Sequence, residues 1–457
     1  MFQEISYQSP LAIFALFAEK EGAVLLDSAQ LRKNCGRYSF IAIDPFLMLK
    51  SKNGLIQLGE KSFSGNPFDV LAEQLKKFHQ ENVKELPPFQ GGAAGFLSYE
   101  LAHHLEKLPF AKKDDMQFPD MALGFYDLVI GFDESEKRAW IFSNGFPEQD
   151  FLKREHRAKQ RMNWLLKQIA DANLSQNVPD RLQEKDIKSN FTCKKYQDAV
   201  KKVINYVLAG DIFEANISQR FQVELPLDFS TFNLYRTLHA LNPAPFAAYL
   251  YLADTVLVSA SPERFLSLKE KHVETRPIKG TRPRGKNLFE DKKFSEELLM
   301  SEKDHAENVM IVDLLRNDLS RVCEDYSVKV PELCRLESYA TVHHLVSIVT
   351  GQLCKNFTAV DLLKATFPGG SITGAPKIRA MEIIAEIEPN ARGPYCGSIG
   401  YIGFNGDMDM SITIRTFAIK NNIATFQAGG AIVADSIPLA EYEETLDKAR
   451  ALRRSLI

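Results

Sequence analysis

Residues 411–427 read SITIRTFAIKNNIATFQ, and this stretch indicates the fold class of the chain. Two runs rich in β-branched and aromatic residues, 411–419 and 423–427, flank the segment KNN at 420–422. Asn tolerates the left-handed backbone conformation of tight turns, so the pattern predicts a β-hairpin of antiparallel strands. From Pro438 to the end of the chain, the sequence predicts a helix that begins at a proline.

Upstream of the hairpin, strands and helices alternate irregularly. Short apolar runs broken by Gly, Pro and Asn predict mainly strands over residues 1–150. Apolar residues at helical spacing predict a helix over 151–170, and Thr192 can cap a second helix that ends at Gly210. Further predicted elements are strands at 216–225 and 255–268 and a helix at 301–321. The irregular order favours an α+β fold over repeated βαβ units.

A polar stretch without periodicity, residues 171–190, is the best candidate linker. It divides the chain into an N-terminal lobe at 1–170 and a larger domain at 191–457. This division agrees with a size of roughly 100 to 200 residues per domain.

The composition excludes several classes of protein. Charged residues make up 25% and hydrophobic residues 45% of the 457 residues, which is typical of a folded globule and not of a disordered or fibrous chain. The net charge is −3 and no long block carries one sign, which disfavours a nucleic-acid partner. The apolar stretch Leu11–Ala18 follows Glu4 and is too short for a signal peptide or a membrane span, so we expect a cytoplasmic protein without a membrane partner.

Two predicted helices carry acidic pairs at a spacing that suits a hard cation. Asp304 and Glu307 lie three residues apart, and Glu441 and Glu444 have the same spacing, with Lys448 one turn further on. Two such pairs facing each other across a cleft would suit Mg²⁺, which takes oxygen ligands and usually also binds a substrate anion. The alternative, which the spacing alone favours, is that these are surface charges of amphipathic helices.

Two glycine-rich segments suggest anion binding. The segment FPGGSITGAPK at 367–377 is not a nucleotide P-loop, because Lys377 comes three positions after Gly374 and Pro376 lacks an amide hydrogen. It still offers backbone amides and the hydroxyl of Ser371 at the start of a helix. A second predicted turn, AGGA at 428–431, follows a strand that pairs with the strand of Arg415. Arg415 and the backbone amides of this turn could together bind a carboxylate, the arginine through two hydrogen bonds.

A lysine and a glutamate form the third feature. Lys279 lies between Ile278 and Gly280 at a predicted strand end, where shielding from water would lower its pKa and make the amine a nucleophile. Glu263, in the segment SASPERF, would then donate or accept a proton opposite it. The alternative of a solvated lysine and a structural glutamate is favoured by the spacing alone.

A set of longer motifs favours the functional interpretation of these residues over the structural one. The segments FEANISQRF, SASPERF, RPIKGTRPRG, HAENVMIVDLLRNDL, VHHLVS, FPGGSITGAPK, RGPYCGSIGY, SITIRT and EYEETLDKARA occur between Cys193 and Ala451. Their order resembles the chorismate-utilising enzymes, the family of anthranilate, aminodeoxychorismate, isochorismate and salicylate synthases. RYSFIAIDP around Tyr38 resembles the N-terminal region of that family. The resemblance implies an α+β fold in which two large antiparallel-rich sheets pack together with helices outside.

One position divides the family. Anthranilate synthases usually have PIAGT where this chain has PIKGT, and Lys279 resembles the aminodeoxychorismate synthase branch of para-aminobenzoate and folate biosynthesis. The resemblance then implies that the Lys279 amine attacks carbon 2 of chorismate while the hydroxyl on carbon 4 departs. Ammonia next adds at carbon 4 and expels the lysine, which gives 4-amino-4-deoxychorismate. Anthranilate or isochorismate synthesis, and a non-catalytic binding or scaffold role, are the alternatives.

The resemblance also implies roles for individual residues. Lys279 is the nucleophile and Glu263 is the general acid and base. The expected ligands of Mg²⁺ are Glu307 and Glu444, assisted by Asp304 and Glu441. The groups expected to hold the carboxylates of chorismate or to line its pocket are Arg415, Tyr395, Gly429, Gly430, Lys448, Ser371, His344 and Glu214. A role as a core histidine is the alternative for His344.

Glu214 departs from the family pattern. That position is often Gln, and in the isochorismate and salicylate branch it is a lysine that activates water. An ionised Glu214 beside Lys279 would hold the amine protonated, so we expect Glu214 to be neutral or turned away.

Two further expectations concern ligands other than chorismate. Many family members have a tryptophan pocket, which in the aminodeoxychorismate branch is structural rather than inhibitory. The matching residues here are Ser28, Arg37, Tyr38, Pro245 and Phe246, and a purely apolar packing role is the alternative for Phe246. None of the six scattered cysteines lies in a Gly-x-Cys-x-Gly turn, so the chain lacks the nucleophile that releases ammonia from glutamine. We therefore expect a glutamine amidotransferase subunit as partner and ammonia donor, with the use of free ammonia at high concentration as the alternative.

Overall fold

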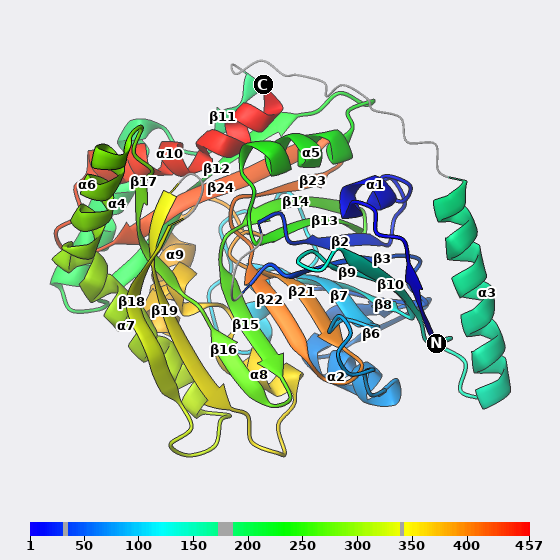
Figure 1. Ribbon diagram of the computed structural model, residues 1–457. Coiled ribbons are helices and arrows are strands. Elements are labelled where there is room, and N and C mark those ends of the chain that lie inside the picture. Colours follow the sequence, from blue (N-terminus) through cyan, green and yellow to red (C-terminus); the bar gives the residue numbers. More distant parts are fainter. Residues whose placement is uncertain (31–34, 172–185, 339–341) are drawn as a thin grey trace.

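The computed structural model of the chain describes residues 1–30, 35–171, 186–338 and 342–457, and it consists of two large sheets with helices outside. The first sheet crosses the upper part of Figure 1, and the second sheet fills the lower part. All strand pairings between the named strands are antiparallel. The α+β prediction with two antiparallel sheets is confirmed.

Strands from both ends of the chain make up the first sheet. Its order is β1 (Phe2–Ile5), β10 (Arg138–Ser143), β9 (Leu128–Asp133), β3 (Tyr38–Ala42), β2 (Ala23–Asp27), β13 (Phe246–Leu252), β14 (Thr255–Ser261), β23 (Thr416–Lys420), β24 (Ile423–Ile432), β12 (Glu214–Glu224) and β11 (Lys188–Ser189). The short strand β20 (Gly374–Ala375) pairs with the start of β12.

The second sheet likewise takes strands from both parts of the chain. Its order is β17 (Ile278–Pro283), β19 (Val342–Gln352), β16 (His272–Thr275), β15 (Arg264–Lys269), β22 (Met408–Ile412), β21 (Ser398–Gly403), β7 (Gly92–Leu97), β8 (Met121–Tyr126), β4 (Leu47–Lys52), β5 (Leu55–Leu58) and β6 (Lys61–Ser64). Strand β18 (Lys329–Ser338) pairs with β19. Residues before and after the predicted linker therefore share both sheets, while 172–185 of that linker lie outside the described residues.

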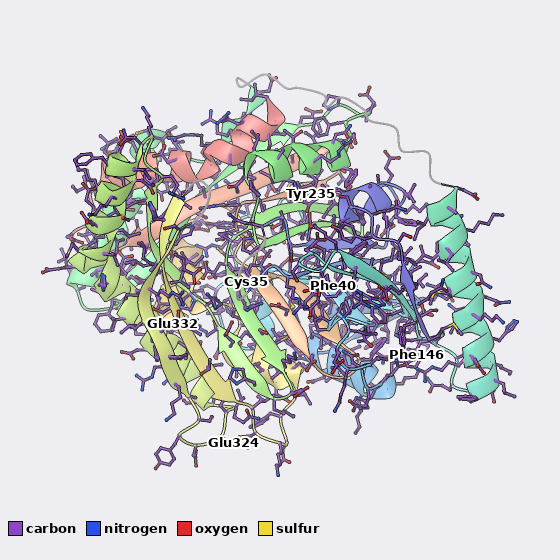
Figure 2. The ribbon with its side chains drawn as sticks, viewed as in Figure 1. Cys35, Phe40, Phe146, Tyr235, Glu324 and Glu332 are labelled. Atoms are coloured by element: carbon purple, nitrogen blue, oxygen red, sulfur yellow. The ribbon has the colours of Figure 1, made fainter. Side chains whose placement is uncertain are left out.

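An apolar layer holds the two sheets together. One buried cluster takes Phe40 and Leu250 from the first sheet and Phe96 and Tyr401 from the second. The ring of Phe40 meets that of Tyr401 edge-on, with 5.5 Å between the ring centroids. Figure 2 shows Phe40 in the middle of the molecule. Burial of such aromatic side chains is the main source of stability between packed sheets.

Helices cover the outer faces (Figure 1). They are α1 (Pro10–Phe14), α2 (Pro67–Lys77), α3 (Phe151–Ala170), α4 (Cys193–Leu208), α5 (Thr231–Leu241), α6 (Leu288–Leu299), α7 (Glu302–Ser320), α8 (Ala359–Thr366), α9 (Lys377–Ile387) and α10 (Pro438–Leu456), with short 3₁₀ turns η1 (Tyr99–His104) and η3 (Gly370–Ile372). The predicted cap is present, because the Thr192 side chain accepts a hydrogen bond from the Lys195 amide. The predicted helices at 151–170, 192–210, 301–321 and 438–457 are confirmed. Within the described residues, no helix is both long and apolar enough to span a membrane.

Three predictions about strands are wrong. The segment 255–268 is two strands, because β14 ends at Ser261 and Pro262, which lacks an amide hydrogen, interrupts the ladder before β15. The segment 411–419 is also split, between β22 and β23, and Arg415 at the break has a φ of 51°. The AGGA segment at 428–431 is not a turn but part of β24, paired with β12.

Both breaks occur where the chain crosses from one sheet to the other, and they lie side by side. The amide of Ile412 donates to the carbonyl of Glu263 at 3.0 Å, and the amide of Ala260 donates to the carbonyl of Arg415 at 3.1 Å. Glu263 and Arg415 are therefore fixed at the junction of the two sheets.

The shared sheets predict that the two parts of the chain fold only together. Residues 1–171 expressed alone would leave β2 without β13 and β7 without β21, so we expect no cooperative thermal unfolding from this fragment. Residues 186–457 alone should show no cooperative unfolding for the same reason. Co-expression of the two fragments should restore one folded complex. Cooperative unfolding of either separate fragment in a calorimeter would contradict this prediction.

Candidate active site

The central contact of the site is a buried ion pair between the two sheets. Lys279 comes from β17 of the second sheet, and Glu214 is the first residue of β12 in the first sheet. The Lys279 Nζ donates to Glu214 Oε1 at 3.2 Å, and the second oxygen, Oε2, is buried without a hydrogen-bond partner among the described residues. Their side chains are 8% and 0% exposed. The pair therefore joins the sheets in a region from which water is excluded.

The local backbone explains how the amine reaches this position. The register of β17 against β19 shifts between Lys279 and Thr281, and Gly280 in between has a φ of 83°. A Cβ at Gly280 would lie 3.0 Å from the Asp304 side chain on α7. Glycine thus permits both the irregular backbone and the close approach of α7.

The charge state of Lys279 differs from the sequence-based prediction. Burial opposes the charged form, but the carboxylates of Glu214 and Glu307 outweigh it and raise the pKa of Lys279 above its ordinary value. The prediction of a lowered pKa for Lys279 is wrong. Its neighbours in sequence shield the amine from water, but the carboxylates that raise its pKa lie on other helices and strands. Glu214 was expected to be neutral or turned away, and the second of these alternatives is wrong, because the two side chains are hydrogen-bonded.

Glu263 is a second buried acid beside the ion pair. Burial raises the pKa of Glu263 to about 7, although hydrogen bonds from Ser371 and from the backbone of Ile278 and the charge of Lys279 act in the opposite direction. The Ser371 Oγ donates to Glu263 Oε1 at 2.5 Å. A carboxyl that exchanges its proton near pH 7 can serve as both acid and base.

The predicted acidic pairs lie on α7 and α10. Several of these acids have partners within the chain: Arg282 pairs with Asp304 at 3.0 Å, Ser436 donates to Glu441 at 2.7 Å, and Lys448 pairs with the half-exposed Glu444 at 2.6 Å. The charge of Lys303 acts on Glu307, Glu441 and Glu444, which places both helices at one site.

Glu307 differs from the other three acids. It makes no hydrogen bond or ion pair within the part of the chain that the structure describes, and burial raises its pKa to about 7. No group of three or more metal-ligating side chains is gathered among the described residues. A half-buried carboxyl without a hydrogen-bond partner, next to further carboxyls, nevertheless fits a hard cation, because a cation would offset this negative charge.

The two predicted glycines let β24 approach the acids of α10. A Cβ at Gly430 would lie 3.2 Å from Glu441 Oε2 and 3.4 Å from Glu444 Oε1. The carbonyl of Gly429 accepts a hydrogen bond from Lys448 Nζ at 2.9 Å. Any larger residue at 430 would push these carboxylates away, so glycine here serves close packing rather than a turn.

The remaining predicted site residues lie on neighbouring elements. His344 is buried on β19, and its Nδ1 is 2.8 Å from the hydroxyl of Thr281. The ring of Tyr395 lies 5.7 Å from the guanidinium of Arg392. Arg415 is half-buried at the sheet crossing described above.

The five residues predicted for tryptophan line a different space. Ser28, Arg37, Tyr38, Pro245 and Phe246 all border a cavity of about 1060 Å³ between the sheets, which does not include Lys279. The structure therefore brings them together, apart from the ion pair.

Sequence reasoning missed a buried arginine near the site. Arg392 is 3% exposed, and its guanidinium binds the equally buried carboxylate of Glu388 through two hydrogen bonds of 2.9 and 2.8 Å. Arg392 stands in the quoted segment RGPYCGSIGY, but spacing alone does not reveal that its charge is enclosed.

Comparisons with known proteins agree with this architecture. The family model described as chorismate binding enzyme matches residues 23–454. The chain belongs to the chorismate binding enzyme family. It is accordingly a chorismate-utilising enzyme, as the motif resemblance predicted.

Individual relatives of this chorismate-utilising enzyme carry two names. Anthranilate synthase component 1 of Thermus thermophilus is 39% identical and covers 98% of this chain and 95% of that protein. Aminodeoxychorismate synthase component 1 of Salmonella typhimurium is 41% identical, and the match covers 95% of this chain and 93% of that protein. The crystal structure of anthranilate synthase component I from Streptococcus pneumoniae superposes with a TM-score of 0.82 at 32% identity and covers 99% of both chains. Overall similarity therefore does not select the reaction.

The ion pair predicts how Lys279 responds to a change at Glu214. Replacement Glu214→Gln removes the carboxylate that raises the pKa of Lys279, so the pKa should fall and more amine should be uncharged at pH 8. Reductive methylation, read by peptide mass spectrometry, should then label Lys279 faster in Glu214→Gln than in the wild type, because a larger share of the amine is uncharged.

Lys377 provides the internal control, because it is a lysine paired with Asp318 at 2.5 Å and makes no contact with Glu214. Its labelling should not change. Equal labelling of Lys279 in the wild type and in Glu214→Gln would show that Glu214 does not govern its charge.

Proposed function

We propose that the chain is an aminodeoxychorismate synthase component I, which converts chorismate and ammonia to 4-amino-4-deoxychorismate in para-aminobenzoate and folate biosynthesis. The observation that carries this proposal is the enclosed amine of Lys279, 3.2 Å from Glu214 and beside Glu263. Relatives with either name match the chain equally well, so the choice between the reactions rests on this lysine.

The substrate brings two carboxylates, and the proposed site offers cations and polar groups to hold them. Arg415 and Lys448 would bind the carboxylates, together with Tyr395 and the segment Gly429–Gly430. Magnesium, when bound, would neutralise negative charge on the substrate and the acids. Its proposed ligands are Glu307 and Glu444, with Asp304 and Glu441 as auxiliary ligands.

The first chemical step requires an uncharged lysine. Lys279 passes its proton to Glu214 Oε1, with which it is already hydrogen-bonded. The free amine attacks carbon 2 of the ring, and the two ring double bonds shift so that the bond from carbon 4 to its hydroxyl breaks. Glu263 gives the departing hydroxide a proton, and water leaves.

The second step reverses the shift of electrons. Ammonia adds at carbon 4, the double bonds return, and the bond between carbon 2 and the Lys279 nitrogen breaks. Glu263, now a carboxylate, takes one proton from the new ammonium group, and Lys279 recovers its proton from Glu214. The ammonia comes from a glutamine amidotransferase subunit, because this chain lacks the cysteine turn that such hydrolysis needs.

Anthranilate synthesis is the second candidate, because relatives with that name share 37–39% identity over almost the whole chain. Isochorismate synthesis is less compatible with the site. In the branch that activates water, a lysine stands where this chain has Glu214.

Product analysis decides between these reactions. Incubation of the enzyme with chorismate, Mg²⁺ and ammonium salt should give 4-amino-4-deoxychorismate by mass spectrometry. Replacement Lys279→Ala should lower the rate at least about 10³-fold, since it removes the nucleophile. Replacement of the exposed Lys195 by Ala is the control and should leave the rate unchanged. Anthranilate or isochorismate as the product, or full activity of Lys279→Ala, would contradict the proposal.

A further inference from the structure

The loop 367–376 connects α8 to α9 and touches both acids of the proposed mechanism. Ser371 of this loop donates to Glu263 Oε1 at 2.5 Å. Four residues later, Ala375 in β20 pairs with Glu214 at the start of β12. The position of this loop therefore sets where the Glu263 carboxyl points relative to the ion pair.

The guanidinium of Arg392 holds the middle of this loop. One of its terminal nitrogens, Nη1, donates to the carbonyl of Ile372 at 3.1 Å, directly after Ser371. The other, Nη2, donates to the carbonyl of Asn216 in β12 at 2.7 Å. A single buried side chain thus ties the serine-bearing turn to the strand that begins with Glu214.

Glu388 fixes Arg392 in turn. Its carboxylate takes two hydrogen bonds from the guanidinium, and its Oε1 also accepts from the amide and the hydroxyl of Ser218 at 2.8 Å each. The Arg392 and Glu388 side chains are 2% and 5% exposed. A buried pair with this many bonds has little freedom to move, since breaking any bond would leave an unpaired polar group.

The two ends of the loop are tied separately. Lys377, just after the loop, donates to the carbonyl of Thr366 just before it at 2.8 Å and pairs with Asp318 of α7 at 2.5 Å. Lys377 therefore closes the loop at its base, whereas Arg392 sets the position of its middle.

We propose that Arg392 is a positioning residue for the reaction: it acts through the Ile372 carbonyl to hold Ser371, and through Ser371 it orients Glu263 for proton transfer. This inference rests on the proposed role of Glu263 as general acid and base. Arg392 itself does not touch the reacting atoms. A lysine cannot replace it, because an ammonium group lacks the planar fork that reaches Ile372, Asn216 and Glu388 together.

A double-mutant cycle tests this path. Arg392→Lys keeps the charge beside Glu388 but loses the fork, and Ser371→Ala removes the hydroxyl that holds Glu263. Each should lower kcat for chorismate about tenfold or more while KM changes less than about threefold, because a misplaced general acid slows proton transfer more than binding. The double variant should be no slower than Ser371→Ala alone, since both changes break one path.

Arg220→Lys is the matched control. Arg220 of β12 is also buried and binds a carboxylate through two hydrogen bonds, those to Asp115 at 2.8 and 2.7 Å, but its side chain makes no hydrogen bond to the loop 367–376 within the described residues. Its kcat should equal that of the wild type. If the losses of kcat in the two single variants multiply in the double variant, the inference is overturned. A change in Arg392→Lys that appears only in KM would overturn it as well.

A readout without turnover separates this inference from the proposed function. Hydrogen exchange of the amides in 367–376 should quicken in Arg392→Lys and stay unchanged in Arg220→Lys. If the wild type fails to form 4-amino-4-deoxychorismate, the proposed function falls, and exchange still reports on the tie between Arg392 and the loop. Unchanged exchange in Arg392→Lys would show that the arginine does not hold the loop.

Discussion

The ion pair between Lys279 and Glu214 is the constraint on which the site depends. Its two members come from different sheets, so the distance between them is set by the packing of the whole molecule. The chain crosses between the sheets next to Glu263 and again at Arg415, and both crossings lie against each other. Residues from distant parts of the sequence therefore meet at one junction, where rigid strands hold them more precisely than mobile loops would.

The balance of charge at this junction explains its chemistry. Lys279 faces the carboxyls of Glu214, Glu307 and Glu263, and burial makes an unpaired charge on any of them costly. The raised pKa keeps the resting amine as an ammonium group, and in the proposed mechanism its proton passes to the adjacent carboxylate before the amine attacks. In the proposed mechanism, Mg²⁺ and the arginine and lysine side chains would offset this surplus of acids when the dianionic substrate binds.

The sequence predicted those features that depend on local pattern. Helix periodicity and capping at Thr192 indicated the helices correctly, and the turn at 420–422 does connect β23 to β24. Alternation along a strand does not reveal a change of sheet, so 255–268 was expected as one strand although Pro262 carried the signal. The sign of the pKa change at Lys279 and the tie made by Arg392 depend on groups far away in sequence, which no spacing rule identifies. The motif resemblance predicted the family correctly, because its long segments are specific.

Trapping the covalent intermediate tests the central claim most directly. The enzyme is incubated with chorismate and Mg²⁺ while ammonia and glutamine are withheld, then quenched and analysed by intact-mass and peptide mass spectrometry. We predict an adduct of chorismate less one water, located on Lys279, that disappears when ammonium is added. An adduct on any other side chain, or product formation with no adduct at Lys279 under single-turnover conditions, would contradict this account.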